Sequence, residues 1–403
     1  MRQNGTIKIG VIGMGRRMSC GNVASLLRLK EEGITIAAVA DPNRKTSLDW
    51  MRRNSIPTEN VTFYDDADEM LEKEKLDGVM IGTRCNLHAQ MAEKVIQQGL
   101  PLFLEKPVFI NEEGQRILTE AGQRLRAPVE VSFPLRMTAL VARAKSIIDS
   151  GTLGTISQVS VINTPAYGRG YFKKWHKFDA LTGGLFLQKA THDFDLVFYL
   201  TGTKPVRVCG MKTRTVMGGD MPRGLTCDEC EKRKTCPESD WVLENKFLEP
   251  PQPHNCVFSQ DVEIEDAGGA LVLLDSGASL VYSQCFVARK SAGLRLYRFV
   301  GFKATLELEF ISGSIKVIHH RDNEIETYTY QEAAGHFGGD EGLMEAFVHL
   351  LRGEECSYPS LTDGMISANL CLTAKRSAER ERFLEVAPFP PSKEARRTAD
   401  AKR

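Results

Sequence analysis

The sequence has no excess of charge of either sign and no long apolar segment. Its 52 lysines and arginines are balanced by 52 aspartates and glutamates, whereas proteins that bind nucleic acid or an anionic membrane usually present a basic face. No apolar run reaches the roughly 18 residues that a membrane-spanning helix needs. The polar start, Met1 to Thr6, lacks the pattern of a signal peptide. We therefore expect a cytoplasmic protein whose partner is a small molecule, with no nucleic acid and no membrane among its partners.

Short β-branched runs alternate with helical stretches through the first third of the chain. Ile7 to Ile12, Ile34 to Ala40 and Gly78 to Ile81 have the pattern of buried strands, and helical segments separate them. Strict alternation of strand and helix implies parallel strands joined by crossover helices. Residues 1–128 are therefore predicted to form an α/β domain around a doubly wound parallel sheet. A chain of 403 residues is too long for a single ordinary core, so a second domain is expected.

After Pro128 the pattern changes. Longer alternating segments are joined by short turns such as Ser312-Gly313 and Asp322-Asn323, which favours antiparallel strand pairs. Residues 129–390 are predicted to form an α+β domain with a largely antiparallel, open sheet. Within it, residues 218–258 are interpreted as a polar insertion, and the charged tail 391–403 is predicted to be disordered.

A glycine-rich turn follows the first strand and opens the first helix. The run Gly13-Met14-Gly15-Arg16-Arg17-Met18 has glycines where a tight turn and a close approach to a pyrophosphate are needed, and a helix N-terminus behind them attracts an anion. A merely structural turn is the alternative, and Met18 departs from the third glycine of the motif. The position after a first strand favours a Rossmann fold with NAD, or NADP, as cofactor. The expected cofactor contacts in this turn are Gly13, Met14, Gly15 and Arg16.

Asp41 follows the second predicted strand. A carboxylate at that position accepts hydrogen bonds from the hydroxyls of an adenosine ribose and repels a 2′-phosphate, which favours NAD over NADP. An Asx turn ahead of Pro42 is the alternative interpretation. Nearby Arg44 weakens the discrimination between the two cofactors.

The segment Glu105-Lys106-Pro107 follows a predicted buried strand, Leu102 to Leu104, at its carboxyl end. Open α/β sheets bind their ligands at that edge. A lysine there can hydrogen-bond a reacting hydroxyl and, where its surroundings lower its pKa, relay a proton. Pro107 can hold the turn through a cis peptide bond. Without this context, the alternative interpretation is that Lys106 is an ordinary surface lysine.

Together these motifs resemble the Gfo/Idh/MocA oxidoreductase family. The glycine turn, Asp41, the segment Thr83-Arg-Cys-Asn-Leu-His88 and Glu105-Lys106-Pro107 occur in the order typical of the family. The resemblance implies a Rossmann domain, a second domain whose open sheet carries contacts of a homodimer or homotetramer, and nicotinamide chemistry on sugars or polyols. It also implies that Thr83, Asn86 and His88 lie near the cofactor and Glu105 near the nicotinamide ribose. Thr83-Arg-Cys-Asn departs from the family's usual Thr-Pro-Asn.

The segment from Gly183 to Asp195 resembles the substrate-site motif of the same family. His192 falls on the motif's histidine, whose ordinary pKa near neutrality suits proton exchange. The motif's aspartate, four residues earlier, is replaced by Gln188, which can hold a hydroxyl but cannot act as a base. Lys189 adds a cation beside it. A structural role is the alternative for both His192 and Lys189.

A branch of the family with this Gln-Lys-x-x-His pattern carries two further segments of the kind seen here. They are Tyr171-Phe-Lys-Lys-Trp-His176 and His336-Phe-Gly-Gly-Asp340. The resemblance makes His176 and His336 additional candidates for substrate contact. A structural histidine at 176, and a helix-entry loop with Asp340 near the helix start, are the alternatives.

These residues suggest an NAD(P)-dependent oxidoreductase that transfers a hydride to or from a hydroxyl carbon of a sugar, polyol or sugar derivative. Lys106 or His192 would exchange the hydroxyl proton, while the protein supplies positioning and charge. The same residues suit an NAD-dependent glycoside hydrolase that oxidises a sugar transiently and eliminates the aglycone. A dinucleotide-binding sensor without catalysis is the third hypothesis, which the retention of Lys106 and His192 disfavours.

Four cysteines gather in the polar insertion, as Cys227-x2-Cys230-x5-Cys236 with Cys256 further along. Four thiolates can hold a structural zinc and clamp a loop too polar to fold around its own core. The spacing matches neither a zinc ribbon nor a standard iron–sulfur arrangement, and a C-x-x-C pair has several meanings. Because a cytosolic protein keeps its cysteines reduced, free thiols are an alternative to zinc, and disulfides are another.

Overall fold

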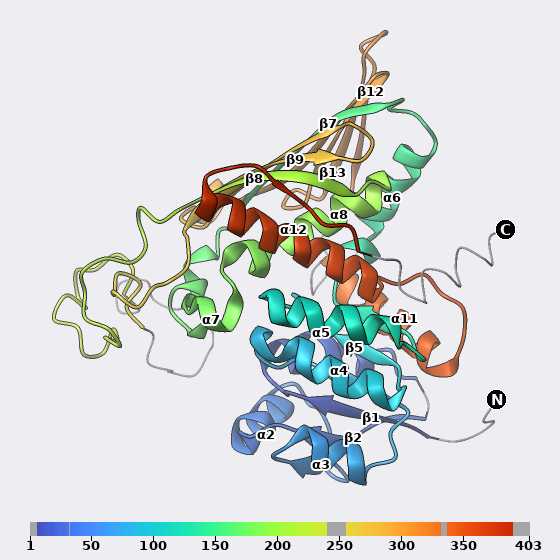
Figure 1. Cartoon of the computed structure of the whole chain (residues 1–403), viewed down its shortest axis with the longest axis vertical. Coiled ribbons are helices and arrows are strands. Elements are labelled where there is room, and N and C mark those ends of the chain that lie inside the picture. The colour runs from blue at the N-terminus through green and yellow to red at the C-terminus, as the bar shows by residue number, and fades with distance from the viewer. Residues whose placement is uncertain (1–5, 32, 240–254, 332–336, 390–403) are drawn as a thin grey trace.

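The computed structural model describes residues 6–31, 33–239, 255–331 and 337–389 of the chain (Figure 1). Two β-sheets lie at opposite ends of the molecule in this view, and helices lie between them. The smaller sheet and its helices are in the lower part of the figure, and the larger sheet is in the upper part. Within the ranges given, no helix combines the length and the apolar character that crossing a membrane requires.

The first sheet is parallel throughout and has six strands in the order β3-β2-β1-β4-β5-β6. They are β1 (Ile7–Ile12), β2 (Ile34–Ala40), β3 (Thr62–Tyr64), β4 (Gly78–Ile81), β5 (Leu102–Leu104) and β6 (Val129–Val131). The chain moves outward from β1 to β3 and then returns to the other side of β1 with β4. The predicted doubly wound sheet is thus confirmed, and sheets of this kind bind ligands where the strand order reverses, here between β1 and β4.

The helices that connect these strands have local causes for their boundaries. They are α1 (Ala24–Arg28), α2 (Arg44–Arg53), α3 (Ala67–Lys73), α4 (His88–Gln98) and α5 (Glu112–Gln123). The side chains of Asn43, Asp66 and Asn111 accept hydrogen bonds from backbone N–H groups in the first turns of α2, α3 and α5. Gly99 ends α4 in the left-handed conformation, with φ +73°, which favours glycine.

A helix from the C-terminal half of the chain completes the core of the first domain. α11 (Gly339–Arg352) buries Leu343 and Phe347 in the same apolar cluster as Ile9 and Phe103 of the first sheet. The rings of Phe103 and Phe347 have centroids 5.7 Å apart. The sequence has a helical pattern from Gly342 to Leu351, but hydrophobic periodicity identifies an apolar face without identifying what that face packs against.

The second sheet has nine strands in the order β14-β13-β12-β11-β7-β10-β9-β8-β15. They are β7 (Ile156–Thr164), β8 (Pro205–Thr213), β9 (Ala267–Leu274), β10 (Ser279–Cys285), β11 (Leu294–Gly301), β12 (Ala304–Glu309), β13 (Ser314–His319), β14 (Ile325–Thr329) and β15 (Leu384–Glu385). Neighbours pair antiparallel except for β7 and β10, which run parallel. The prediction of a largely antiparallel sheet is confirmed.

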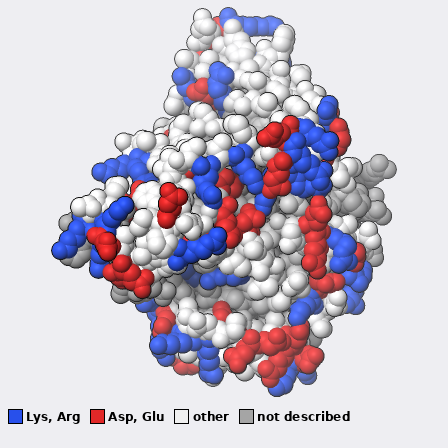
Figure 2. Space-filling model, turned by 60° about the vertical axis from the view of Figure 1, so that its left-hand side comes forward, with Lys and Arg blue, Asp and Glu red and all other residues white. Residues whose placement is uncertain are grey.

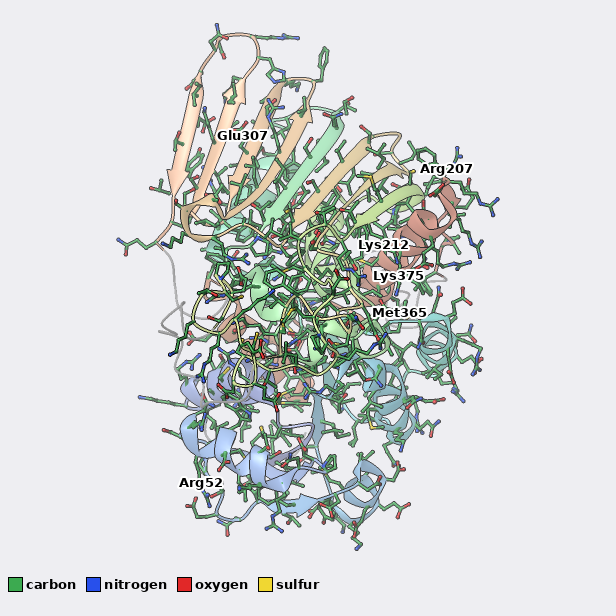
Figure 3. The ribbon with its side chains drawn as sticks, turned by 90° about the vertical axis from the view of Figure 1, so that its left-hand side faces the viewer. Arg52, Arg207, Lys212, Glu307, Met365 and Lys375 are labelled. Atoms are coloured by element: carbon green, nitrogen blue, oxygen red, sulfur yellow. The ribbon has the colours of Figure 1, made fainter. Side chains whose placement is uncertain are left out.

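One face of the second sheet is covered by helices, and the other is open. α6 (Ala139–Asp149), α8 (Thr191–Thr201) and α12 (Leu361–Arg380) lie between this sheet and the first domain, with the single turn α7 (Asp179–Thr182) at one side (Figure 1). Figure 3 shows the strands of this sheet from a side on which no helix lies in front of them. Figure 2 shows fewer charged side chains over this upper part of the molecule than below it. The large apolar side chains exposed on β7 to β10 are Ile162, Met211, Leu271, Leu273 and Val281.

Candidate functional site

The glycine turn follows β1, at the reversal point of the first sheet. Gly13 has a positive φ of 83°, and a β-carbon on it would lie 2.7 Å from the backbone nitrogen of Thr83, so the turn requires glycine there. A β-carbon on Gly15 would meet no atom within 4 Å, so the space beside its backbone is open. The helical segment that follows, Arg17–Val23, begins without a side-chain cap. Open backbone beside an uncapped helix N-terminus suits a pyrophosphate.

Met18 occupies the place of the motif's third glycine, and the structure accommodates it through its neighbour. Gly82, directly after β4, faces Met18, and a β-carbon on Gly82 would lie 2.8 Å from the β-carbon of Met18. The helix opens as a π-helix over Arg17–Val23 before it continues as α1, and such wider turns are frequent at functional sites. The glycine that permits close helix–strand packing is therefore on the strand side of the contact.

Asp41 follows β2, and its carboxylate is tied to the glycine turn. Oδ2 accepts a hydrogen bond from the N–H of Met14 (3.0 Å), and Oδ1 accepts one from the N–H of Asn43 (2.9 Å). The second contact is the Asx turn that was the alternative interpretation of this residue. The Met14 side chain is fully buried in the core. The guanidinium of Arg44 lies over the Phe63 ring, 4.9 Å from its centroid.

The loop after β4 carries Thr83, Asn86 and His88. The Oδ1 atom of Asn86 is buried and accepts no hydrogen bond from the part of the chain that the structure describes, so an additional donor would satisfy it. His88 is 1% exposed, with Nδ1 2.8 Å from the backbone oxygen of Pro107 and Nε2 3.2 Å from that of Thr83. Burial lowers the pKa of His88, so this side chain ties two loops together rather than exchanging protons.

Glu105 follows β5 and accepts three hydrogen bonds on one carboxylate oxygen. The donors are Arg17 Nε (3.0 Å), Asn22 Nδ2 (2.7 Å) and Ser132 Oγ (3.0 Å). Burial alone would raise the pKa of Glu105, but the charge of Arg17 and the hydrogen bond from Asn22 outweigh burial and lower it. Arg17 also forms a bidentate pair with Asp340 in the first turn of α11 (2.8 and 2.7 Å). Glu105 is therefore an ionised carboxylate in a fixed position.

Lys106 reaches from the first domain to the second. The Lys106–Pro107 peptide bond is cis, and the Lys106 ammonium donates a hydrogen bond to the backbone oxygen of Gln188 (2.6 Å). Burial, and then the neighbouring ammonium of Lys189, lower the pKa of Lys106 to about 8. The side chain of Gln188 donates to the Sγ of Cys85 (2.9 Å). These contacts join the loops of the first domain to the predicted substrate motif of the second.

The substrate motif forms a buried helical turn that leads into α8. Gln188 and Lys189 lie in a π-helical segment, Phe186–Ala190, and His192 lies in the first turn of α8. His192 is 7% exposed, and its ring meets that of Phe133 edge-on at 5.9 Å. Asp193 anchors the helix through its buried carboxylate, which accepts hydrogen bonds from Asn163, Tyr282, Arg295 and Tyr297. The orientation of α8 is thus fixed by strands of the second sheet.

The segment Tyr171–His176 places three rings beside the loop after β4. Trp175 stacks on His176 with 3.9 Å between centroids, and the Arg84 guanidinium lies 3.9 Å from the Trp175 centroid. Tyr171 meets His176 edge-on at 5.3 Å. Burial, and then the positive charge of Arg84, lower the pKa of His176 to about 3. His176 therefore stays neutral at physiological pH and is suited to hydrogen bonding rather than to proton exchange.

Several residues of this site were not predicted from the sequence. Arg17 was named only as part of the glycine run, although it holds both Glu105 and Asp340. Arg84 stands where the family usually has proline, and the sequence alone suggests no role for it. Tyr167, which accepts a hydrogen bond from the Lys189 ammonium (2.6 Å), carries no sequence signal. The predicted contact His336 lies outside the described residues.

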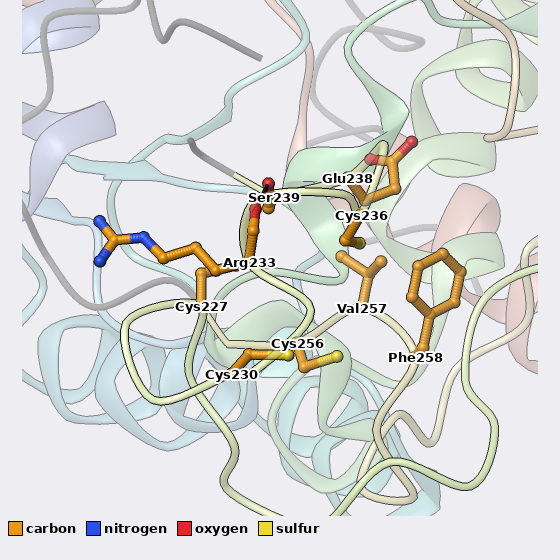
Figure 4. Close-up of a pocket in the computed structure, with 9 residues that line it drawn as sticks. All are labelled: Cys227, Cys230, Arg233, Cys236, Glu238, Ser239, Cys256, Val257 and Phe258. Atoms are coloured by element: carbon orange, nitrogen blue, oxygen red, sulfur yellow. Dashed lines mark hydrogen bonds between the residues drawn. The ribbon is translucent and has the colours of Figure 1, made fainter. Parts of the chain in front are cut away.

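The four cysteines of the insertion line one pocket, together with Arg233, Glu238, Ser239, Val257 and Phe258 (Figure 4). Within the described ranges, however, no group of three or more His, Cys, Asp and Glu side chains is arranged to hold a metal ion. Among the residues described, none of the four cysteines forms a disulfide. The structure therefore does not support the predicted zinc site. Sequence spacing brings Cys227, Cys230, Cys236 and Cys256 to a common pocket, but it does not fix a tetrahedral arrangement of their sulfurs.

Two family profiles together match most of the chain. Residues 7–133 match the oxidoreductase family described as having an NAD-binding Rossmann fold. Residues 145–386 match the C-terminal alpha/beta domain of the same family, Gfo/Idh/MocA. The two matches correspond to the two sheets of the structure.

Similar curated proteins are bacterial. The chain is 29% identical to YteT of Bacillus subtilis (strain 168), which is named as an oxidoreductase, over 70% of this chain and 74% of YteT. It is 28% identical to the rhizopine catabolism protein MocA of Rhizobium meliloti over 53% of this chain and 62% of that protein. It is 26% identical to scyllo-inositol 2-dehydrogenase (NAD(+)) of Bacillus subtilis (strain 168) over 51% and 56% of the two chains. The matched regions thus span about three-fifths of the last two proteins.

Solved structures share the fold at low identity. An oxidoreductase domain protein from Kribbella flavida has a TM-score of 0.75 at 15% identity, covering 95% of this chain and 100% of that one. Levoglucosan dehydrogenase in complex with NADH and levoglucosan has a TM-score of 0.73 at 16% identity, covering 94% and 99%. At these identities the likeness establishes the two-domain architecture.

Proposed function

Because the chain belongs to the Gfo/Idh/MocA oxidoreductase family, with its NAD-binding Rossmann fold and C-terminal alpha/beta domain, we propose that it is an NAD-dependent dehydrogenase acting on a sugar, polyol or sugar derivative. The observation that carries this proposal is the hydrogen bond from Lys106 to the backbone of Gln188 (2.6 Å). It brings a lysine with a lowered pKa from one domain to the motif that carries His192 in the other. Relatives named as inositol and levoglucosan dehydrogenases are compatible with this substrate class.

The residues of the chain fit a bound dinucleotide. The open backbone at Gly15 suits the pyrophosphate, and the fixed carboxylate of Asp41 suits the adenosine ribose. Glu105, ionised and held in place by three donors, suits the nicotinamide ribose, and the unpartnered Oδ1 of Asn86 supplies an acceptor. When bound, NAD supplies the hydride acceptor that no side chain can provide.

Two side chains of the site position the substrate hydroxyl and accept its proton. Lys106 in its neutral form accepts the hydroxyl proton as the carbon is oxidised, which its lowered pKa makes accessible near neutral pH. His192, buried at the start of α8, positions the same hydroxyl or shares the proton. Gln188 and the neutral His176 hold further hydroxyls by hydrogen bonding. Because Asp193 fixes α8 and Glu105 is fixed by Arg17, the two halves of the site are positioned before substrate binds.

Turnover measurements test this function. The chain is incubated with NAD and a panel of sugars, polyols and sugar acids, and reduced nicotinamide is followed by absorbance. Net NADH formation on a free sugar is the expected result. Cleavage of a glycoside without net NADH would favour the glycoside hydrolase instead. Tight NAD binding with no turnover on any member of the panel would favour a sensor and overturn the proposal.

Cofactor preference is expected to depend on the charge of Asp41. The unsubstituted chain should bind NADH more tightly than NADPH, because this carboxylate repels a 2′-phosphate. Asp41→Asn removes the charge and keeps an acceptor for one of the two N–H groups, Met14 or Asn43, that bond to the carboxylate, and it should shift the NADPH-to-NADH affinity ratio by about tenfold or more toward NADPH. Fluorescence titration with both cofactors measures the ratio. Tighter binding of NADPH by the unsubstituted chain would contradict the assignment.

We also propose that a second copy of the chain covers the open face of the larger sheet. Leu271 and Val281 face each other across β9 and β10 and are 51% and 37% exposed, and apolar patches of this kind mark protein interfaces. Leu271→Arg is expected to convert a dimer or tetramer into smaller species in light scattering. Val216→Arg, at an apolar residue 48% exposed outside the strands, is the control. A monomeric unsubstituted chain would refute the proposal.

A further inference from the structure

Lys189 is a buried cation whose partners in the described part of the chain are uncharged hydroxyls and rings. The residue is 6% exposed, and its ammonium lies 2.6 Å from Tyr167 Oη and 5.8 Å from the ring centroid of Tyr171. Within those ranges no carboxylate forms an ion pair with it. Burial would lower the pKa of Lys189, but attraction to Tyr167 and Tyr171 outweighs burial and raises it, so the ammonium stays charged. In return, the pKa of Tyr167, which burial alone would raise, is lowered by the charge of Lys189. Buried ammonium groups are rare unless an anion accompanies them.

Among the residues that the structure describes, the charges around Lys189 do not supply that anion. Glu105 and Asp193, the buried carboxylates of the site, are each paired with an arginine (3.0 and 2.5 Å). Lys106 adds a second positive charge beside Lys189, since its ammonium bonds the backbone oxygen of the preceding residue, Gln188. The side chain of Gln188 is uncharged where the family motif has an aspartate. In the described part of the chain, the surroundings of Lys189 therefore lack a carboxylate that is not already paired with an arginine.

The ammonium lies beside an accessible side chain. Tyr167, whose hydroxyl accepts the hydrogen bond from Lys189, is 56% exposed as a residue, so a single side chain separates the ammonium from solvent. The rings of Tyr171 and His176 meet edge-on at 5.3 Å and offer the apolar surface on which a sugar ring packs. The Nδ1 atom of His176 is buried and has no hydrogen-bond partner among the residues described. A sugar hydroxyl would satisfy it.

We propose that the substrate is a sugar acid, of the uronate or aldonate class, whose carboxylate binds between the Lys189 ammonium and the hydroxyls of Tyr167 and Tyr171. This proposal rests on the dehydrogenase function and names its substrate class. One ammonium and two hydroxyls supply donors for both oxygens of a carboxylate. A phosphate carries more charge and is usually bound by arginine or by several backbone N–H groups. The oxidised carbon then lies at Lys106, and the carboxylate at Lys189.

Matched neutral and acidic sugars test the proposal. With NAD as cofactor, kcat/KM is compared for glucose and glucuronate, for galactose and galacturonate, and for glucose 6-phosphate. We expect the acid of each pair to be preferred by about tenfold or more. Lys189→Met should reduce that preference by about 10- to 100-fold, mainly through KM, because a charge-assisted hydrogen bond is lost. Lys189→Arg should restore part of it.

Lys212→Met is the matched control, because it removes one positive charge from a partly exposed position on β8 (Figure 3). It should leave the preference for acids unchanged. If neutral sugars are oxidised as well as their acids, if Lys189→Met leaves the preference intact, or if glucose 6-phosphate is the better substrate, the carboxylate site is wrong while the dehydrogenase function stands.

If no sugar reduces NAD, the dehydrogenase function is wrong. The carboxylate site at Lys189 is then tested separately, by measuring ligand binding. Calorimetry then compares glucuronate with glucose as probes of the NADH-loaded protein. Tighter binding of glucuronate that Lys189→Met abolishes supports the carboxylate site. Equal binding of the two probes, or binding of neither, overturns it.

Discussion

Lys106→Met is expected to lower kcat for sugar oxidation by about 10²- to 10⁴-fold, the range typical of losing a general acid–base group. Methionine keeps most of the length of the lysine side chain, so packing between the two domains is preserved while the contact with Gln188 is lost. Steady-state rates with NAD measure the effect. Lys94→Met, which removes a lysine paired with Asp68 on the surface, should leave kcat unchanged. Activity of Lys106→Met within tenfold of the unsubstituted chain would remove Lys106 from the mechanism.

The pH dependence of the same reaction follows from the pKa of Lys106, which burial and Lys189 lower to about 8. Oxidation needs the neutral amine as proton acceptor, so kcat/KM should rise with pH and level off above about pH 8. Reduction needs the protonated form, so its rate should fall over the same interval. Lys106→Met should abolish this inflection. His176, with a pKa near 3, contributes no inflection near neutral pH.

Arg17→Met is expected to cost about 3 kcal/mol of folding free energy, because it leaves two buried carboxylates without their cation. The side chains of Glu105 and Asp340 are 8% and 3% exposed, and both are bonded to this one guanidinium. Urea-induced unfolding, followed by circular dichroism, measures the loss. NADH binding should weaken in the same variant, since Glu105 loses the charge that most favours its ionised state and one of the three donors that hold it in position.

Arg28→Met is the matched control for Arg17→Met. Arg28 also reaches a carboxylate of α11, that of Glu341 at 2.8 Å, but both side chains are about half exposed. An exposed ion pair of this kind contributes about 1 kcal/mol or less. The double variant Arg17→Met with Glu105→Gln should recover part of the lost stability, because one of the two buried carboxylates that lose the guanidinium is then replaced by a neutral group. Equal losses for Arg17→Met and Arg28→Met would show that the buried carboxylates do not depend on Arg17.

Most strands of the first sheet were predicted to the residue. β1, β2, β4 and β5 have the bounds that the sequence indicated, because a buried parallel strand is a continuous apolar run with sharp ends. β6 was missed, since its middle residue is Glu130. That side chain is fully buried, and burial raises its pKa well above the ordinary range. A carboxyl group buried in its neutral form cannot be distinguished from a surface glutamate by pattern alone.

The motif residues of the site were predictable, but their partners were not. Lys106 and Gln188 are 82 positions apart, and Arg17 and Asp340 are 323 apart. Such contacts depend on how the two domains pack, which no local pattern encodes. The zinc prediction is not supported, for a related reason, since the spacing of the cysteines predicts proximity but does not fix the arrangement of their sulfurs. The resemblance placed His88 near the cofactor. In the described structure its ring nitrogens bond backbone oxygens only.

The return of α11 to the first sheet makes the two halves of the chain inseparable as folding units. A fragment that stopped after β6 would contain every strand of the nucleotide-binding sheet, yet its apolar surface around Ile9 and Phe103 would face water in place of Leu343 and Phe347. It would also lack Asp340, one of the two anions that hold the arginine of the glycine turn. Recombination or engineering that exchanges the nucleotide-binding module between homologues must therefore carry residues 339–352 along with it.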